Sequence, residues 1–118
     1  MNNFNENLKF LRIINTNIEK LEAEDLSGSK IVLLEISFSR IVTLDFKAFD
    51  FIKNTLNYIQ FISNGMNYVK NISDRPKGLT YVNFFANTCV NNDLSASGLE
   101  DYQINLSFML KSCLSVDY

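Results

Sequence analysis

The chain has 118 residues, of which 47% are hydrophobic and 20% are charged, with a formal net charge of -2 and a pI near 5.0. This length suits a single domain, 1–118, and the composition excludes wholesale disorder and collagen-like classes. So weak a charge creates no field that attracts phosphate backbones or anionic lipid, so we expect neither nucleic acid nor a membrane as partner. The apolar runs are also too short for a membrane-spanning helix.

The first six residues lack the basic and apolar regions of a secretory signal, so we expect a cytoplasmic protein. In that compartment Cys89 and Cys113 could pair but are expected to be reduced, packing as small apolar side chains. Heavy use of asparagine and isoleucine resembles the bias of an AT-rich genome, such as that of a low-GC bacterium or its phages and plasmids. No internal repeat of solenoid length is evident.

The first half of the chain predicts a hairpin followed by a helix. Apolar residues in 8–22 also fit helical spacing, but Ile13 to Ile18 is poor in helix formers and Asp25 to Ser29 suits a turn, so we favour a strand. Residues 31–44 are rich in β-branched residues and predict one long strand.

From Phe46 to Ile62, apolar residues recur every three or four positions, which predicts a helix capped by Asp45. Gly65 is its expected end, with a short strand after it over 66–72. If the helix instead continues through Gly65, it runs toward Ser73 and that strand disappears.

Two further strands are expected in the second half of the chain. Apolar residues alternate over 79–91 and again over 103–110, with a polar loop between them. The element order is then ββαβββ, or ββαββ with the longer helix. These patterns predict an α+β, two-layer fold, in which an antiparallel sheet of four to five strands packs against one main helix.

The chain is poorly equipped for catalysis. It contains no histidine, which removes the commonest general base and metal ligand at neutral pH. The cysteines lack zinc-site spacing, and the glycines stand singly rather than in a phosphate-binding loop. We therefore expect no enzyme activity, no cofactor and no metal.

One face of the predicted sheet is polar but almost uncharged and carries aromatic residues. Tyr81 and Phe85 lie on it from strand 79–91, Met109 from the last strand, and Tyr68 if the short strand exists. Aromatic residues and methionine are enriched in protein interfaces, where charge is depleted. These four residues are the predicted partner contacts, and a homodimer is one possible arrangement.

A second candidate site depends on the first hairpin. If its strands pair antiparallel around Ser27, Arg12 and Arg40 become diagonal neighbours beside apolar residues. The structural interpretation is that they reach solvent or pair with Asp45 or Asp50, whereas the functional one is a small anion site.

Two functions follow as hypotheses. The first is a non-catalytic protein-binding module, such as an inhibitor, immunity or counter-defence factor of a phage or mobile element. The alternative is a carrier of a small ligand or peptide, with a pocket between sheet and helix lined by Phe38, Phe49 and Phe108.

Overall fold

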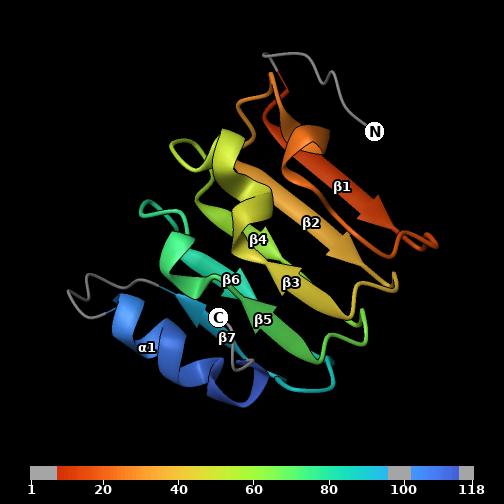
Figure 1. Cartoon of the computed structure of the whole chain (residues 1–118), viewed down its shortest axis with the longest axis vertical. Helices are drawn as coiled ribbons and strands as arrows, with labels where there is room; N and C mark the ends of the chain where they lie inside the picture. Colours follow the sequence, from red (N-terminus) through yellow and green to blue (C-terminus); the bar gives the residue numbers. More distant parts are fainter. Residues whose placement is uncertain (1–7, 96–101, 115–118) are drawn as a thin grey trace.

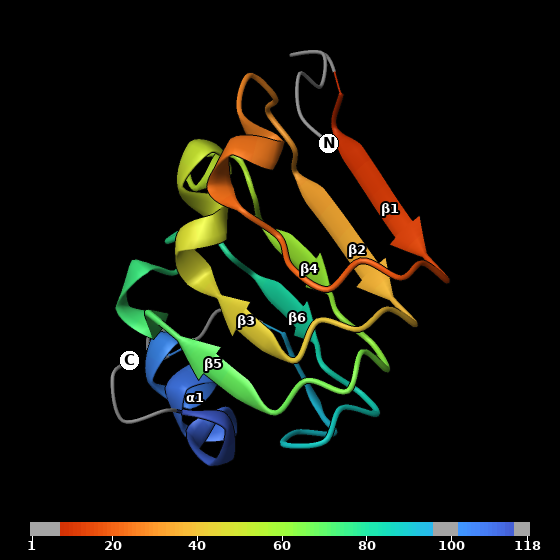
Figure 2. The same cartoon turned by 45° about the vertical axis from the view of Figure 1, so that its right-hand side comes forward.

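The computed structural model describes residues 8–95 and 102–114, and its strands form two sheets that face each other (Figures 1 and 2). The larger sheet has five strands in the order β1-β2-β4-β6-β7, of which the first four are parallel and β7 is antiparallel to β6. Its strands are β1 (Phe10–Ile14), β2 (Leu33–Ser37), β4 (Tyr58–Gln60), β6 (Tyr81–Asn83) and β7 (Asp93–Ser95). The smaller sheet pairs β3 (Thr43–Asp45) with β5 (Tyr68–Lys70), also in parallel.

Short helical turns connect the strands. Four are 3-10 helices: η1 (Ala23–Leu26), η2 (Phe46–Ile52), η3 (Ile72–Asp74) and η4 (Lys111–Cys113). The one α-helix in the described residues is α1 (Tyr102–Met109). The chain winds in successive coils. The second coil runs through β2, β3 and η2, and the third runs through β4, β5 and η3, so that each passes from the larger sheet to the smaller sheet and back. The chain is therefore a short solenoid.

The coils share one sequence pattern. They begin at Leu8, Ile31, Leu56 and Leu79, which are 23, 25 and 23 residues apart. Counting each of these as position 1, positions 4 and 6 are apolar, position 9 is Thr, Ser or Asn, and position 11 is Ile, Met or Cys. These residues are Leu11, Ile13, Thr16 and Ile18; Leu34, Ile36, Ser39 and Ile41; Ile59, Phe61, Asn64 and Met66; and Val82, Phe84, Asn87 and Cys89. The same pattern recurs in all four coils, so the expectation that the chain has no repeat is wrong.

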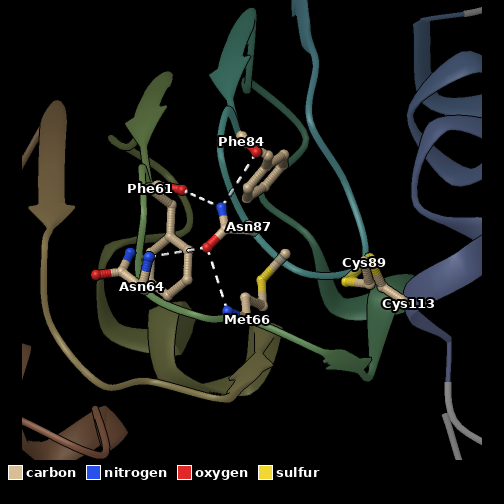
Figure 3. The surroundings of a disulfide bond; sticks show 7 residues. All are labelled: Phe61, Asn64, Met66, Phe84, Asn87, Cys89 and Cys113. Atoms are coloured by element: carbon tan, nitrogen blue, oxygen red, sulfur yellow. Dashed lines mark hydrogen bonds between the residues drawn. A yellow bond between two sulfur atoms is a disulfide. The ribbon is translucent and has the colours of Figure 1, made fainter.

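Buried amides join the third and fourth coils. The Asn87 side chain donates to the carbonyls of Phe61 (2.6 Å) and Phe84 (3.1 Å), and its Oδ1 accepts from the backbone N–H groups of Asn64 (3.0 Å) and Met66 (3.2 Å) (Figure 3). Asn64 continues the pattern, since its Oδ1 accepts from Ser39 N and its Nδ2 donates to the Ile36 carbonyl. These bonds satisfy backbone groups that the turns between coils would otherwise bury unpaired.

The two ends of the solenoid differ. At the last coil, a disulfide joins Cys89 to Cys113, just beyond α1, with an S–S distance of 2.06 Å (Figure 3). The expectation that these cysteines are reduced is therefore wrong in this structure. At the first coil, the equivalent core residues Leu8, Leu11 and Ile18 are only partly buried, whereas their counterparts in the second coil are at most 1% exposed. The core is thus closed at the α1 end and partly open at the β1 end.

The predicted two-layer antiparallel fold with one main helix is wrong. The described sheets are mainly parallel, because equivalent strands of successive coils pair with one another, so that β2 pairs with β4 and β4 with β6 across the strand that lies between them in sequence. The orders ββαβββ and ββαββ are overturned with it. The preference for a strand within 8–22 is confirmed over Phe10–Ile14.

The predicted helix over 46–62 is also wrong. Its first part is the 3-10 turn η2, and its last part is strand β4. Spacing of three to four residues is shared by a 3-10 turn and by the L-x-x-L segment that precedes a strand, so the periodicity does not distinguish them from an α-helix. The short strand expected over 66–72 exists as β5, and Gly65 adopts a φ of 71° in the turn before it.

The strand expected over 103–110 is a helix in the structure, α1. Leu106 and Leu110 are both fully buried, as residues four apart on one helix face should be, whereas Phe108 is 68% exposed. The predicted long strand over 31–44 is divided into β2 and β3, since Phe38 takes a left-handed conformation with φ of 56°.

Candidate binding face

The outward face of the five-stranded sheet carries ordered rows of side chains. The register places Phe10, Leu33, Tyr58, Tyr81 and Ser95 in one row across the strands. Two residues further along the strands, a second row contains Arg12, Glu35, Gln60, Asn83 and Asp93. We call the surface formed by these two rows, with Ile14 and Phe85 beside them, the binding face.

Glu35 is the centre of a polar network on this face. Its Oε1 accepts from Arg12 Nε at 2.6 Å, and its Oε2 accepts from Ser37 Oγ and Gln60 Nε2, both at 3.2 Å. Glu35 is only 7% exposed, and a nearly buried carboxylate requires such partners. The network therefore fixes side chains from β1, β2 and β4 relative to one another.

Aromatic side chains extend this network across β6. The rings of Tyr58 and Tyr81 stack with centroids 4.5 Å apart, and Tyr58 donates a hydrogen bond to Gln60 Oε1. Tyr81 donates to Asp93 Oδ2 at 3.2 Å. Partial burial raises the pKa of the Tyr81 phenol, and the hydrogen bond to Asp93 raises this pKa further. A connected path of side chains thus runs from Arg12 to Asp93 over all five strands.

Large apolar side chains border the polar row without being buried. Phe10 is 63% exposed, and Ile14 and Phe85 are each 40% exposed. An aromatic platform with a fixed polar centre and exposed apolar margins has the composition of a protein interface. The polar groups of the network are two carboxylates, a guanidinium, a serine hydroxyl, an amide and two phenols.

The predicted partner-binding residues do not share one surface. Tyr81 lies on the binding face and Phe85 lies beside it, as the alternation predicted. Tyr68 belongs to β5 in the smaller sheet, where it is 47% exposed, and Met109 lies on α1, partly buried against the core. Sequence reasoning missed Tyr58, Glu35 and Gln60, because only the parallel register aligns these residues with Tyr81.

The predicted register between Arg12 and Arg40 is also wrong. Because β1 and β2 are parallel, Arg12 lies opposite Glu35 and forms an ion pair with it. Arg40 instead lines a cleft of about 650 Å³ together with residues 19–24 and the segment around β3. The two arginines therefore do not become diagonal neighbours in a hairpin.

The pocket proposed between sheet and helix is not formed by the residues expected to line it. Phe49 is buried in the core, at 1% exposure, whereas Phe38 and Phe108 are 55% and 68% exposed. The three rings consequently do not surround one cavity. The interior contains fully buried aromatic residues instead, such as Phe61 and Phe84, whose rings pack edge to face.

Within residues 8–95 and 102–114, no three His, Cys, Asp or Glu side chains gather as a metal site would require. Over the same residues, no helix is long and apolar enough to cross a membrane. Comparisons of the chain with protein-family models, curated proteins and solved structures find no match.

Proposed function

We propose that the protein is a non-catalytic binding module that holds a segment of another protein against the binding face. The observation that carries the proposal is the connected path from Arg12 to Asp93, which spans all five strands of the larger sheet. Solenoids use such extended sheet surfaces for binding, because stacked coils present equivalent positions side by side.

The arrangement favours binding for a thermodynamic reason. Association usually immobilises interface side chains, and each one ordered costs roughly 0.5–1.5 kcal/mol. Glu35, Gln60, Tyr58 and Tyr81 are already held by hydrogen bonds and stacking, so most of that cost is met during folding. Tyrosine is also a residue type in which binding energy concentrates.

The biological role within this class stays a prediction. Small size, the absence of histidine and the asparagine-rich composition support an inhibitor, immunity or counter-defence factor from a phage or mobile element.

The disulfide bears on the compartment in which the protein works. Disulfides persist in oxidising compartments and are rare in the cytosol, so the Cys89–Cys113 bond favours an oxidising environment over the cytoplasm expected from the sequence.

The proposal is tested by affinity capture from the source organism with the wild-type chain, Tyr81→Ala, Phe85→Ala and the control Phe51→Ala. Phe51 is 58% exposed but lies on η2, outside the larger sheet. A partner of the binding face should be recovered by wild type and the control and lost with both sheet variants. Equal recovery by all four proteins would contradict the proposal.

A further inference from the structure

We propose that the partner is anchored at the carboxyl edge of the larger sheet, defined by Ile14, Phe38 and Phe85, and that the occupant is the apolar face of an amphipathic helix of the partner protein. The inference rests on the proposed function and adds to it the anchoring residue and the kind of partner segment.

Phe38 occupies a backbone position that disfavours it. The residue at position 8 of each coil is left-handed: Asn15 (φ 61°), Phe38 (φ 56°), Ser63 (φ 57°) and Ala86 (φ 61°). Asparagine tolerates this conformation, whereas a bulky aromatic residue rarely adopts it and loses folding free energy there. Phe38 gains little from burial in return, since it is 55% exposed. An unfavourable backbone and an exposed ring together indicate a role outside folding.

The left-handed residues of successive coils lie side by side. The Asn15 N–H donates to the Ser37 carbonyl, and the Phe38 N–H donates to the Ile62 carbonyl. The Ser63 N–H donates to the Phe85 carbonyl in the same way. The parallel ladder thus continues past the strand ends, and adjacent coils remain about 4.8 Å apart. No charged residue lies at 14–15, 37–38, 62–63 or 85–86, so this edge complements an uncharged, apolar surface.

The area of the edge favours a partner segment over a second copy of the chain. Ile14, Phe38 and Phe85 are 40%, 55% and 40% exposed. For side chains of roughly 200 Å² this is about 270 Å², or about 540 Å² counting both partners. Stable interfaces between folded proteins bury at least about 1,200 Å², so the edge alone is too small for one.

The chemistry of the edge favours a helix over an extended peptide. Apolar rings offer no hydrogen bonds to the backbone of an extended segment, whereas a helix pairs its own N–H and C=O groups internally and presents only side chains. The dimensions agree as well, because the helical pitch of about 5.4 Å is close to the strand spacing of about 4.8 Å. A helix laid across the strands can therefore place apolar side chains at the first, second and fourth coils, which carry Ile14, Phe38 and Phe85.

The test uses a display library of overlapping peptides tiled across the proteome of the organism that encodes the chain, each long enough for four helical turns, about 15 residues. Selected peptides are measured against wild type, Phe38→Asn, Phe85→Ser and the control Phe51→Asn. We expect sequences with apolar residues at i, i+4 and i+11 that become helical on binding, because the three anchors lie on the first, second and fourth coils. Affinity should fall at least 10-fold with Phe38→Asn and Phe85→Ser and stay unchanged with the control.

Thermal unfolding of the same variants provides an independent readout. Phe38→Asn should raise the melting temperature, because asparagine suits the left-handed backbone, so lost binding is not explained by unfolding. A lowered melting temperature would make Phe38 a structural residue and overturn the inference. Co-sedimentation of wild type, but not of Phe38→Asn, with phosphatidylcholine vesicles would assign the edge to a membrane and also overturn it.

The binding function of the sheet face and the anchoring of a helix at its edge are contradicted by different results. Peptides that lose affinity with Tyr81→Ala but not with Phe38→Asn, or that bind in an extended form, would overturn the anchoring inference and leave the binding function intact. Peptides that bind wild type, Tyr81→Ala and Phe85→Ser equally would overturn both.

Discussion

Replacing Asn87 by alanine tests whether buried amides hold the coils together. Asn87 is 8% exposed, and its side chain makes four hydrogen bonds to the backbone. In Asn87→Ala, the N–H groups of Asn64 and Met66 and two carbonyls lose these partners. Each buried group left unsatisfied costs roughly 1–3 kcal/mol, so the two donors alone should cost about 4 kcal/mol.

That loss is large against the roughly 5–15 kcal/mol that stabilises a typical domain. Urea unfolding followed by circular dichroism should show a reduced midpoint with an unchanged slope, and the melting temperature should fall by at least about 10 °C. The matched control is Thr88→Ala at the exposed neighbouring residue, where a change within about 0.5 kcal/mol is expected. A cost below about 1 kcal/mol in Asn87→Ala would refute the reasoning, since water would then be replacing the amide.

Three further predictions concern the disulfide and the binding face. Reduction of the Cys89–Cys113 bond should destabilise the protein by about 3 kcal/mol, seen as a lower melting temperature with reductant; two thiols titrating in the untreated protein would contradict the bond. Glu35→Ala should cost about 2 kcal/mol in denaturant unfolding, because three donors lose a nearly buried acceptor, whereas a cost near zero would mean that the network is solvated. The pKa of Tyr81 is raised in the folded state. The contribution of Tyr81 to the free energy of unfolding is therefore fully present below the ordinary tyrosine pKa of about 10 and is lost as pH rises through the pKa of the folded state. Ultraviolet titration should show this pKa falling in Asp93→Asn, and no change would contradict the role of that hydrogen bond.

The local positions of several strands could be predicted from the sequence, but their pairing could not. Alternation correctly placed Val82 and Phe84 inward and Tyr81 outward. The partners of β6, however, are residues 58–60 and 93–95, and no short-range pattern specifies a parallel neighbour in the preceding coil. Without that register, Tyr58 could not be assigned to the same face as Tyr81.

The repeat was obscured by the residue types that fill it. Phe61, Met66 and Cys89 replace the aliphatic residues of the pattern, and the position taken by Asn64 and Asn87 is Thr16 in the first coil. The apolar or polar character of each position is preserved although the residue types differ, so each coil still contributes to the core and to the turn in the same way. Alignment of 8–18, 31–41, 56–66 and 79–89 would have revealed it, and with it the parallel sheet.

The difference between the two ends of the solenoid has a consequence for how the chain folds. Contacts between coils join residues only about one repeat apart, so order can nucleate in one region and propagate to neighbouring coils. The disulfide-linked end, with fully buried Leu106 and Leu110, is the natural nucleus. The β1 end, where Leu8 and Leu11 are only partly covered, should fray first. Amide hydrogen exchange would then be fastest in β1 and slow progressively through β2 and β4 toward β6.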